Sequence, residues 1–307
     1  MYPNHSGGAF VSMKQHLRIG SRDSALAVIQ ARQLVDFLQQ VHPKLSLELV
    51  TMKTTGDRIL DRTLDKVGGK GLFVKELDRA LLAGEVDLTV HSAKDLPAQL
   101  DSRLPLVAFS KRANPFDVLV LPQGQSERDA GLPIASASPR RVAQLRSLFP
   151  NTPIEPVRGN LQTRLGKLDG GQFGALVLAA AGLERLGMEH RINRIFSPEE
   201  MLPAACQGIL AVQARQDFDT GLLEGFGDMS STLCALAERA FVTAMDGGCS
   251  APMGAYGEYR QGFLHLQGMI GESQSGMIQR NELKGPVSTP QEAETLGKML
   301  AQAFGKR

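Results

Sequence analysis

The stretch LRIGSRDSALAVIQARQLVDFLQQVHPKLSLELVTMKT, residues 17–54, decides the fold that we expect for this chain. It begins with a short apolar strand over 17–21, and Ser24 then caps a helix whose apolar residues recur at helical spacing. Pro43 ends that unit, and residues 45–54 alternate apolar and polar side chains as a strand does. A strand, a helix and a second strand in this order predict a parallel sheet with helices on its faces.

The alternation of strands and helices continues along the chain. We expect a helix from about Leu72 to Gly84, followed by a strand over 86–91. Residues 101–115 are then the connection to a second α/β unit. Strands of that second unit are expected at 116–121, 133–138, 153–157 and 174–182, with helices capped by Ser138 and Asn160.

The chain changes character from Ser230 onward. A helix over 232–245 precedes two alternating stretches, AYGEYR and GFLHLQGMIG, and a last helix begins near Pro290. This order predicts a small α+β unit after the two α/β units.

Composition excludes several classes of protein. The 307 residues carry a formal net charge of +2, which disfavours a nucleic-acid-binding protein, and 42% are hydrophobic, as in a globular protein. No apolar run reaches the roughly 18 residues of a membrane helix. The first residues lack the pattern of a signal peptide, so we expect a cytoplasmic protein in which residues 1–13 are a disordered extension. Cys206, Cys234 and Cys249 show no paired or metal-ligand spacing, and we predict no metal site.

Arginines and lysines crowd the turns at helix starts in the first two-thirds of the chain. A cation in the first turn of a helix opposes the helix dipole and costs a few tenths of a kcal/mol up to about one. The same cost repeated at five strand-to-helix junctions indicates that a polyanion is bound there. The cations concerned are Arg22, Lys66, Lys70, Lys94, Arg140, Arg141, Arg158 and Arg164.

The glycine turn VGGKGLFVKE, residues 67–76, resembles a phosphate-binding loop but lacks its residue order, because Leu72 stands where a hydroxyl group would bind magnesium. One interpretation is a turn that only starts a helix. Lys66, Lys70 and Lys75 favour the other, a mobile loop that handles an anion. Phe73 fits the core best, and a ring in this place can also stack on a flat ligand.

The segment HSAKDLP, residues 91–97, lies where a parallel strand ends, which is where open α/β sheets bind ligands. Asp95 beside Lys94 is a candidate general acid/base that can also stabilise positive charge developing on nitrogen. The alternative for a single Asp is a turn in which the carboxylate caps local N–H groups. His91 fits a structural histidine better than a catalyst.

Two further segments, SASPRR (136–141) and RGNLQTR (158–164), each carry two arginines, whose planar guanidinium groups suit carboxylates. No acidic residue lies within one turn of Arg140 or Arg141, so local pairing does not explain them. Cys249 follows two glycines after a helix, where a thiol is accessible and can act as a nucleophile; the alternative, a small buried side chain, is the commoner fate of a free cysteine.

These segments resemble the porphobilinogen deaminase family, also called hydroxymethylbilane synthases. The similar segments come in the family's order from about residue 16 to the end of the chain. They include RIGSRDSALA (18–27), KVGGKGLFVKELDRALL (66–82), HSAKDLP (91–97), SASPRR (136–141), RGNLQTRLGKLD (158–169), LAAAGLERLG (178–187), LPAACQG (202–208) and AERAFVTAMDGGCSAPMGAY (237–256).

The resemblance implies a fold and an activity. It implies two doubly wound α/β domains like those of periplasmic binding proteins, at 14–108 with 207–226 and at 109–206, plus a small α+β C-terminal domain at 230–307 that attaches the cofactor. The implied enzyme is a transferase that joins four porphobilinogen molecules head to tail with loss of ammonia and releases hydroxymethylbilane by hydrolysis. The implied partners are this substrate alone, with no nucleic acid or membrane, and the implied state is a monomer.

The resemblance also assigns roles to residues. It implies that Cys249 carries a dipyrromethane cofactor as a thioether and that Asp95 handles the pyrrole nitrogen protons and stabilises cationic intermediates. Gln207 and Gly208 match the hinge segment near the cofactor, with Phe73 at the cleft. The residues that match the family's acetate- and propionate-binding positions are Arg22, Ser24, Lys66, Lys70, Ser92, Lys94, Ser138, Arg140, Arg141, Arg158, Arg164 and Arg185.

The chain departs from the family pattern at three positions. Cys206 replaces a usual glycine, which leaves the local backbone conformation open and adds a second thiol, while Ala137 and Pro139 replace a common serine and leucine. The main alternative function is a non-enzymatic anion-binding protein of periplasmic type, which has no use for Cys249. A lyase that forms a Schiff base on Lys70 or Lys94 does not explain the arginine pairs.

Overall fold

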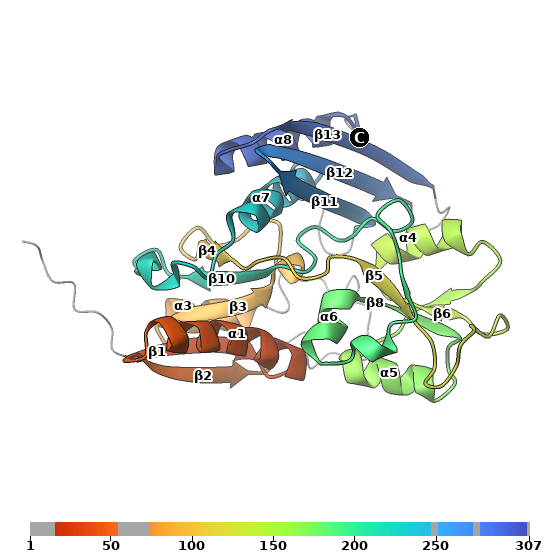
Figure 1. Ribbon diagram of the computed structural model, residues 1–307, viewed down its shortest axis with the longest axis horizontal. Helices are drawn as coiled ribbons and strands as arrows, with labels where there is room; N and C mark the ends of the chain where they lie inside the picture. Colours follow the sequence, from red (N-terminus) through yellow and green to blue (C-terminus); the bar gives the residue numbers. More distant parts are fainter. Residues whose placement is uncertain (1–15, 55–73, 247–250, 273–276, 306–307) are drawn as a thin grey trace, which may run out of the picture.

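In the computed structural model the described residues are 16–54, 74–246, 251–272 and 277–305, and they form three sheets with helices around them (Figure 1). Figure 1 shows the first two sheets side by side and the third, with its helices, on top of them. The expected disordered extension, residues 1–13, lies outside the described residues.

The first sheet has the strand order β2-β1-β3-β10-β4. β1 pairs in parallel with β2 and β3, whereas β10 is antiparallel to both β3 and β4. Leu34 and Leu38 of α1 pack on its apolar face. The elements of this unit are β1 (His16–Arg22), α1 (Ala25–Val41), β2 (Ser46–Met52), α3 (Lys75–Leu82), β3 (Leu88–Ser92), η1 (Ala93–Asp95), β4 (Leu106–Phe109), β10 (Leu210–Ala214) and η3 (Thr220–Leu223).

The second sheet repeats this arrangement in the order β7-β6-β8-β5-β9. β6 pairs in parallel with β7 and β8, and β5 is antiparallel to β8 and β9. Its elements are β5 (Asp117–Val120), β6 (Ile134–Ala135), α4 (Pro139–Leu148), β7 (Ile154–Glu155), α5 (Leu161–Asp169), β8 (Ala175–Ala179), α6 (Ala180–Arg185), η2 (Glu189–Arg191) and β9 (Arg194–Ile195).

The prediction of parallel sheets is wrong for one strand in each unit. β5 and β10 run against their neighbours, and they are the strands that directly follow the two passages of the chain between the units. Two strands that follow each other within one sheet run parallel only when a crossover, usually a helix, connects them. β5 and β10 come directly from the other unit without such a crossover, so they can run antiparallel to their neighbours. The strand expected over 174–182 is also too long, because the alanine-rich segment from Ala180 forms α6.

The third sheet is an antiparallel meander of β11 (Met253–Arg260), β12 (Phe263–Gly271) and β13 (Ile278–Pro286). α7 (Met229–Ala244) and α8 (Pro290–Gln302) pack together on one face around Phe241, Leu266 and Leu300. Asp228 caps α7, and Thr289 forms a capping box with Glu292 at the start of α8. The α+β character expected for this part of the chain is confirmed, although the polar strand β13 was not predicted.

A buried carboxylate joins the three sheets. Glu238 of α7, which has no exposed surface, accepts hydrogen bonds from Arg112 Nη2 (2.6 Å), the Cys206 N–H (2.5 Å) and the Gly257 N–H (2.7 Å). Arg112 lies on the first passage between the α/β units, Cys206 on the return passage, and Gly257 in β11. The third unit is therefore fixed at the point where the chain crosses between the other two.

Candidate active site

The carboxyl end of β3 presents Ser92, Lys94 and Asp95. The chain turns there through η1, which leaves Asp95 exposed and Lys94 half-buried. Ser92 Oγ lies 2.8 Å from Nε2 of Gln30, so α1 holds this serine in place. Burial lowers the pKa of Lys94 to about 8; Asp95 opposes the shift, and the nearby arginines Arg141 and Arg140 add to it.

Arg22 and Ser24 lie beside these residues along the edge of the first sheet. Arg22 ends β1 and Ser92 ends β3, and these strands are parallel, so both residues lie at the same edge. Ser24 caps α1 by accepting a hydrogen bond from the Ala27 N–H (3.4 Å). His91 is buried in β3, where its Nε2 lies 2.9 Å from Thr89 Oγ1, and its pKa is lowered to about 4, mainly by burial, so it stays neutral, as expected of a structural histidine.

Arg140 and Arg141 form the first turn of α4, which Ser138 caps. Both are buried, and both bind Asp117: Arg140 Nη1 to Oδ2 (2.6 Å), Arg141 Nη2 to Oδ1 (2.7 Å). Burial alone raises the pKa of Asp117, but the two guanidinium groups outweigh it and hold the pKa well below its usual range. The sequence shows no local partner for the arginine pair, and the fold supplies a distant one at the start of β5.

Gln207 connects the two halves of the site. Its Nε2 donates to Asp117 Oδ1 (3.0 Å) and to the Pro115 carbonyl (2.6 Å), while its Oε1 accepts from Lys94 Nζ (3.2 Å). A continuous hydrogen-bonded path thus runs from the end of β3 through the hinge segment to the arginine pair. Next to it, Gly208 has a φ of +90°, and a Cβ there would lie 2.5 Å from the Ala113 carbonyl oxygen, so this position requires glycine.

Arg158 and Arg164 flank the start of α5, where Asn160 is the N-cap. Arg164 Nε donates to the Gly159 carbonyl (2.8 Å), and burial lowers the pKa of Arg164 to about 10, with further lowering by Arg141 and an opposite effect of Asp95. Arg158 Nε is buried and has no hydrogen-bond partner among the described residues. An orphaned guanidinium donor in this place suits a bound carboxylate.

The residues around Asp95 form what we call the cationic cluster. Its cations are Lys94, Arg140, Arg141, Arg158 and Arg164, which act on one another's pKa values, and its carboxylates within the described residues are Asp95 and Asp117. The charge is therefore strongly unbalanced toward positive in a half-buried place, which favours an anionic ligand with several carboxylates.

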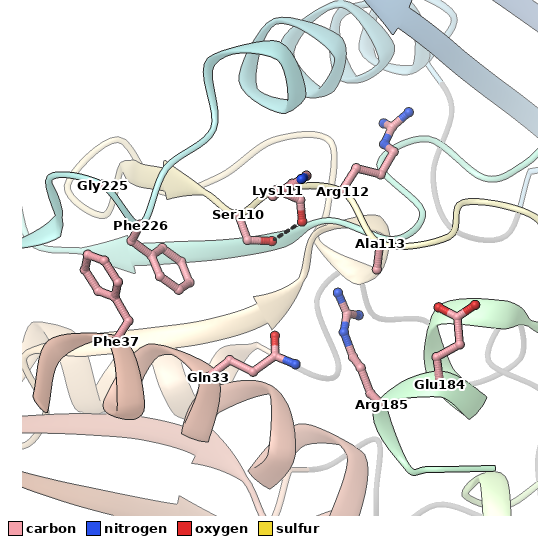
Figure 2. Close-up of a pocket in the computed structure, with 10 residues that line it drawn as sticks. All are labelled: Gln33, Phe37, Ser110, Lys111, Arg112, Ala113, Glu184, Arg185, Gly225 and Phe226. Atoms are coloured by element: carbon pink, nitrogen blue, oxygen red, sulfur yellow. Dashed lines mark hydrogen bonds between the residues drawn. The ribbon is translucent and has the colours of Figure 1, made fainter. Parts of the chain in front are cut away.

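Arg185, which the resemblance groups with the residues of this cluster, comes from a different helix. It ends α6 and donates to the Gly208 carbonyl (2.7 Å), and burial lowers its pKa to about 10, an effect that Glu184 opposes. Figure 2 shows Arg185 in a pocket with Gln33 and Phe37 of α1 and the segment 110–113. Through Gly208 the side chain of Arg185 is linked to the hinge segment that also carries Gln207.

The structure shows the backbone conformation at Cys206 and the surroundings of its thiol. Its φ is +62°, a left-handed conformation that explains why glycine is usual there. The thiol is buried, lies 3.5 Å from the Ala235 carbonyl, and has a pKa raised to about 12 by burial and by Glu238. Cys234 is buried with a similarly raised pKa. Both thiols are therefore unreactive.

Four expected site residues lie outside the described residues: Lys66, Lys70, Phe73 and Cys249. Within the described residues, the sequence did not identify three residues that the structure shows to be important: Gln30, Asp117 and Glu238. For Asp117 a signal was available, because a lone acid that opens the apolar strand FDVLVL must find a cation when it is buried. The described residues contain no group of side chains that could hold a metal ion and no helix long and apolar enough to cross a membrane.

Comparison with known proteins gives a consistent result. Residues 17–222 match the family model "Porphobilinogen deaminase, dipyromethane cofactor binding domain", and residues 232–306 match "Porphobilinogen deaminase, C-terminal domain". The porphobilinogen deaminase of Acetivibrio thermocellus is 52% identical over 94% of this chain and 98% of its own length, and that of Chromobacterium violaceum is 43% identical over 92% of each. Among solved structures, the periplasmic aliphatic sulphonate binding protein of Escherichia coli is similar at a TM-score of 0.41 and 12% identity, over 76% of this chain and 71% of that chain.

Proposed function

Because this chain belongs to the porphobilinogen deaminase family, we propose that the cationic cluster is where its porphobilinogen units are joined. Porphobilinogen deaminase activity in tetrapyrrole biosynthesis, and a domain that binds a dipyrromethane cofactor, follow from the membership itself. The membership favours this enzyme over the alternative function, a non-enzymatic anion-binding protein. The finer steps that we propose are head-to-tail condensation of four porphobilinogen molecules with loss of ammonia, then hydrolytic release of hydroxymethylbilane.

The observation that carries this proposal is the unbalanced charge beside an exposed carboxylate. Arg140 and Arg141 share a single carboxylate partner within the described residues, Asp117, while Arg158 and Arg164 are in no ion pair there. Each pyrrole of the growing chain brings carboxylate side chains, so the chain becomes a polyanion that needs several fixed cations. Asp95 is the carboxylate at the exposed end of this array.

The residues present fit the cofactor. The orphaned Nε of Arg158 and the spare charge of the arginine pair offer donors for the carboxylates of a dipyrromethane. When bound, the dipyrromethane supplies the first acceptor pyrrole. We propose that it is held as a thioether by Cys249, because the other two thiols are buried and carry raised pKa values.

The chain's own residues then have separate tasks. Asp95 places negative charge where positive charge develops on nitrogen as ammonia leaves, and its carboxylate takes up a proton. Ser24, Ser92, Ser138 and Arg22 add hydroxyl and guanidinium donors along the same sheet edges, and Lys66 and Lys70 are proposed to act with them. Asp117 is a positioning residue, because it fixes both arginines directly and fixes Lys94 through Gln207.

Replacing Asp95 by alanine tests the assigned role. We expect Asp95→Ala to fold normally and to retain the cofactor mass, while turnover falls on the order of 100-fold or more. Asp101→Ala is the matched control, because Asp101 is a nearby acid paired with Arg103 and not a member of the cluster. Near-normal turnover in Asp95→Ala would refute the role of this carboxylate.

The attachment residue can be identified by intact mass without measuring activity. We expect the purified chain to exceed the mass of its polypeptide, and we expect Cys249→Ser to have the bare mass. Cys206→Ala and Cys234→Ala should keep the extra mass, because their thiols lie in the core. Loss of the extra mass in either of these two variants would show that a different thiol carries the cofactor.

The three sheets also support a proposal about the division of the chain. We propose that they mark three domains with the boundaries given above for the resemblance, of which the first is discontinuous. We further propose a monomer in the cytoplasm, in line with the family. Light scattering of the purified chain at several concentrations checks the monomer, and a mass that doubles with concentration would contradict it.

A further inference from the structure

Arg140 and Arg141 each bind a backbone carbonyl group, but the two carbonyls lie in different kinds of segment. Arg141 Nη1 donates to the carbonyl of Val177 (3.0 Å), which lies inside strand β8. Arg140 Nη1 donates to the carbonyl of Leu202 (2.6 Å), which lies in the passage between β9 and β10, outside any helix or strand. A strand holds its carbonyls through the sheet, whereas the backbone of a connecting segment needs other partners. The position of Arg140 therefore depends on what holds Leu202.

Gln144 of α4 binds Leu202 at both of its backbone polar groups. The Gln144 side chain has no exposed surface; its Oε1 accepts from the Leu202 N–H (2.7 Å), and its Nε2 donates to the Leu202 carbonyl (3.1 Å). Nε2 also donates to the carbonyl of Arg140, one turn earlier in α4 (3.3 Å). The amide thus makes the two hydrogen bonds that a neighbouring strand would make. The carbonyl that it holds is the one that binds the Arg140 guanidinium group.

The third unit reaches the same amide through Arg280 of β13. Arg280 donates from Nη2 to Gln144 Oε1 (2.9 Å) and from Nη1 to the Pro198 carbonyl (2.9 Å). Oε1 therefore has two donors, the Leu202 N–H and this guanidinium group, which together fix the orientation of the amide. Part of Arg280 is exposed in a groove of about 310 Å³ between α4 and β13. Replacing this arginine therefore leaves the core closed.

The other two strands of the third sheet support the same region. The Ala255 N–H of β11 donates to the carbonyl of Pro203, the neighbour of Leu202 (3.1 Å). A Cβ on Gly271, which ends β12, would lie 2.8 Å from the Ala143 Cβ of α4. Figure 1 shows α4 next to the ends of these strands, and α4 contacts both. The third unit therefore holds α4 and the segment after it with all three of its strands.

We propose that Gln144 and Arg280 are positioning residues for Arg140. Gln144 fixes the Leu202 carbonyl, and this carbonyl fixes the guanidinium plane in which Arg140 binds a carboxylate of the pyrrole chain. This role rests on the proposed function, in which the cationic cluster binds those carboxylates. Nη1 of Arg140 donates to Leu202 and to Asp117 Oδ2, so two acceptors define how the rest of the planar fork is presented. Because Arg280 belongs to the third unit, the geometry of the arginine pair depends on where that unit lies.

A double-mutant cycle with Arg140 tests this role. Gln144→Met keeps the length of the side chain and removes its hydrogen bonds. We expect it to raise the KM for porphobilinogen about tenfold and to leave kcat within about twofold, because Asp95 is untouched. Arg140→Gln should raise KM at least as much, and the double variant should match Arg140→Gln alone, since no guanidinium group is left to place. Intact mass gives a second readout without activity: the fraction of chains that carry the cofactor should fall in the same variants and be equally non-additive.

Variants on β13 test the contribution of the third unit. Arg280→Met should raise KM about threefold, and Arg280→Lys should stay within about twofold of the parent, because an ammonium group can still donate to Gln144 Oε1. Glu282→Gln is the matched control, two residues further along β13 on the same face. Within the described residues Glu282 is hydrogen-bonded to His265 and Gln267 of its own unit, so KM should not change. If Gln144→Met does not fold, Arg280→Met takes its place in the cycle.

The outcomes separate this role from the function on which it rests. Parent values of KM and of the cofactor-carrying fraction in Arg140→Gln would contradict the proposed function, and the positioning role with it. An impaired Arg140→Gln beside parent values in Gln144→Met and Arg280→Met would overturn the positioning role alone. Effects that add in the double variant would also overturn it, because additivity means that Gln144 does not act through Arg140.

Discussion

Glu238 and Asp117 are both buried carboxylates that bind arginine at a passage of the chain between units, yet their surroundings differ. Glu238 has one arginine, Arg112, and two backbone N–H groups as partners. Asp117 has two arginines and the amide of Gln207. The first group of charges is balanced within the protein, whereas the second leaves one positive charge over.

The difference separates a structural junction from a binding site. A balanced and fully hydrogen-bonded buried pair offers nothing to a ligand, and its removal leaves buried donors without partners. An arginine pair that shares one carboxylate holds its geometry and still attracts an anion. The following experiments contrast the two carboxylates, starting with the largest expected effect.

Glu238→Gln should be the most destabilising change. The amide offers one oxygen to the two backbone N–H groups of Cys206 and Gly257 and leaves Arg112 buried without a counter-charge. We expect the free energy of unfolding to fall by about 3–5 kcal/mol, as for broken buried ion pairs. Urea unfolding followed by circular dichroism measures it. A loss below about 1 kcal/mol would mean that this junction does not hold the three units together.

Asp117→Asn should destabilise less, by about 2 kcal/mol, because the arginines keep hydrogen bonds to the Leu202 and Val177 carbonyls. Its distinctive feature should be rescue by anions. Adding sulfate should restore more stability in Asp117→Asn than in Glu238→Gln, since only the arginine pair can accept an added anion. Sulfate stabilises proteins in general, so the difference between the two variants is the measurement. Equal rescue would remove the distinction between the two sites.

Lys94 provides a smaller, pH-dependent effect on the same network. Its pKa is lowered to about 8, mainly by burial, so the ammonium is lost as the pH rises through that value. Porphobilinogen KM should therefore rise above pH 8, by at most about tenfold per pH unit. The unfolded chain retains this proton up to its ordinary pKa of 10.5, so stability should increase with pH between 8 and 10.5. Lys94→Gln should show neither trend, and the same profiles in that variant would contradict the assignment.

Cys206→Gly should have the smallest effect. Glycine removes the cost of a left-handed residue, about 1 kcal/mol, but increases the entropy of the unfolded chain and loses a buried thiol. We expect the free energy of unfolding to stay within about 1 kcal/mol of the parent and the cofactor mass to be unchanged. A loss larger than about 2 kcal/mol would show that the thiol contributes to the Glu238 junction.

Much of the fold could be predicted because it depends on local signals. Ser24, Ser138 and Asn160 cap their helices as expected, since a cap needs only residues a few positions apart. The direction of β5 and β10 could not be predicted, because it depends on where the chain enters each sheet. β13 was missed because its polar residues, such as Arg280 and Lys284, lack the apolar run expected of a strand.

The candidate site was predicted in part for the same reason. Asp95, Arg140 and Arg164 stand at strand or helix ends that a sequence can locate. Their partners are remote: Asp117 lies 23 residues before Arg140, and Gln207 lies 113 residues after Lys94. Arg185 is likewise tied to a residue remote in sequence, because its Nη2 donates to the carbonyl of Gly208, the neighbour of Gln207.

The sequence by itself determined the alternating β-α-β pattern of residues 17–54, the capped helices and the excess of cations at their starts, because these depend on neighbours along the chain. Only the tertiary structure decided which charges are neutralised. Burial makes the charge of a side chain depend on whichever groups surround it in space, and those groups come from strands far apart in sequence. The tertiary structure therefore distinguished Glu238, whose charge is balanced within the protein, from Asp117, whose two arginines leave a positive charge for a ligand.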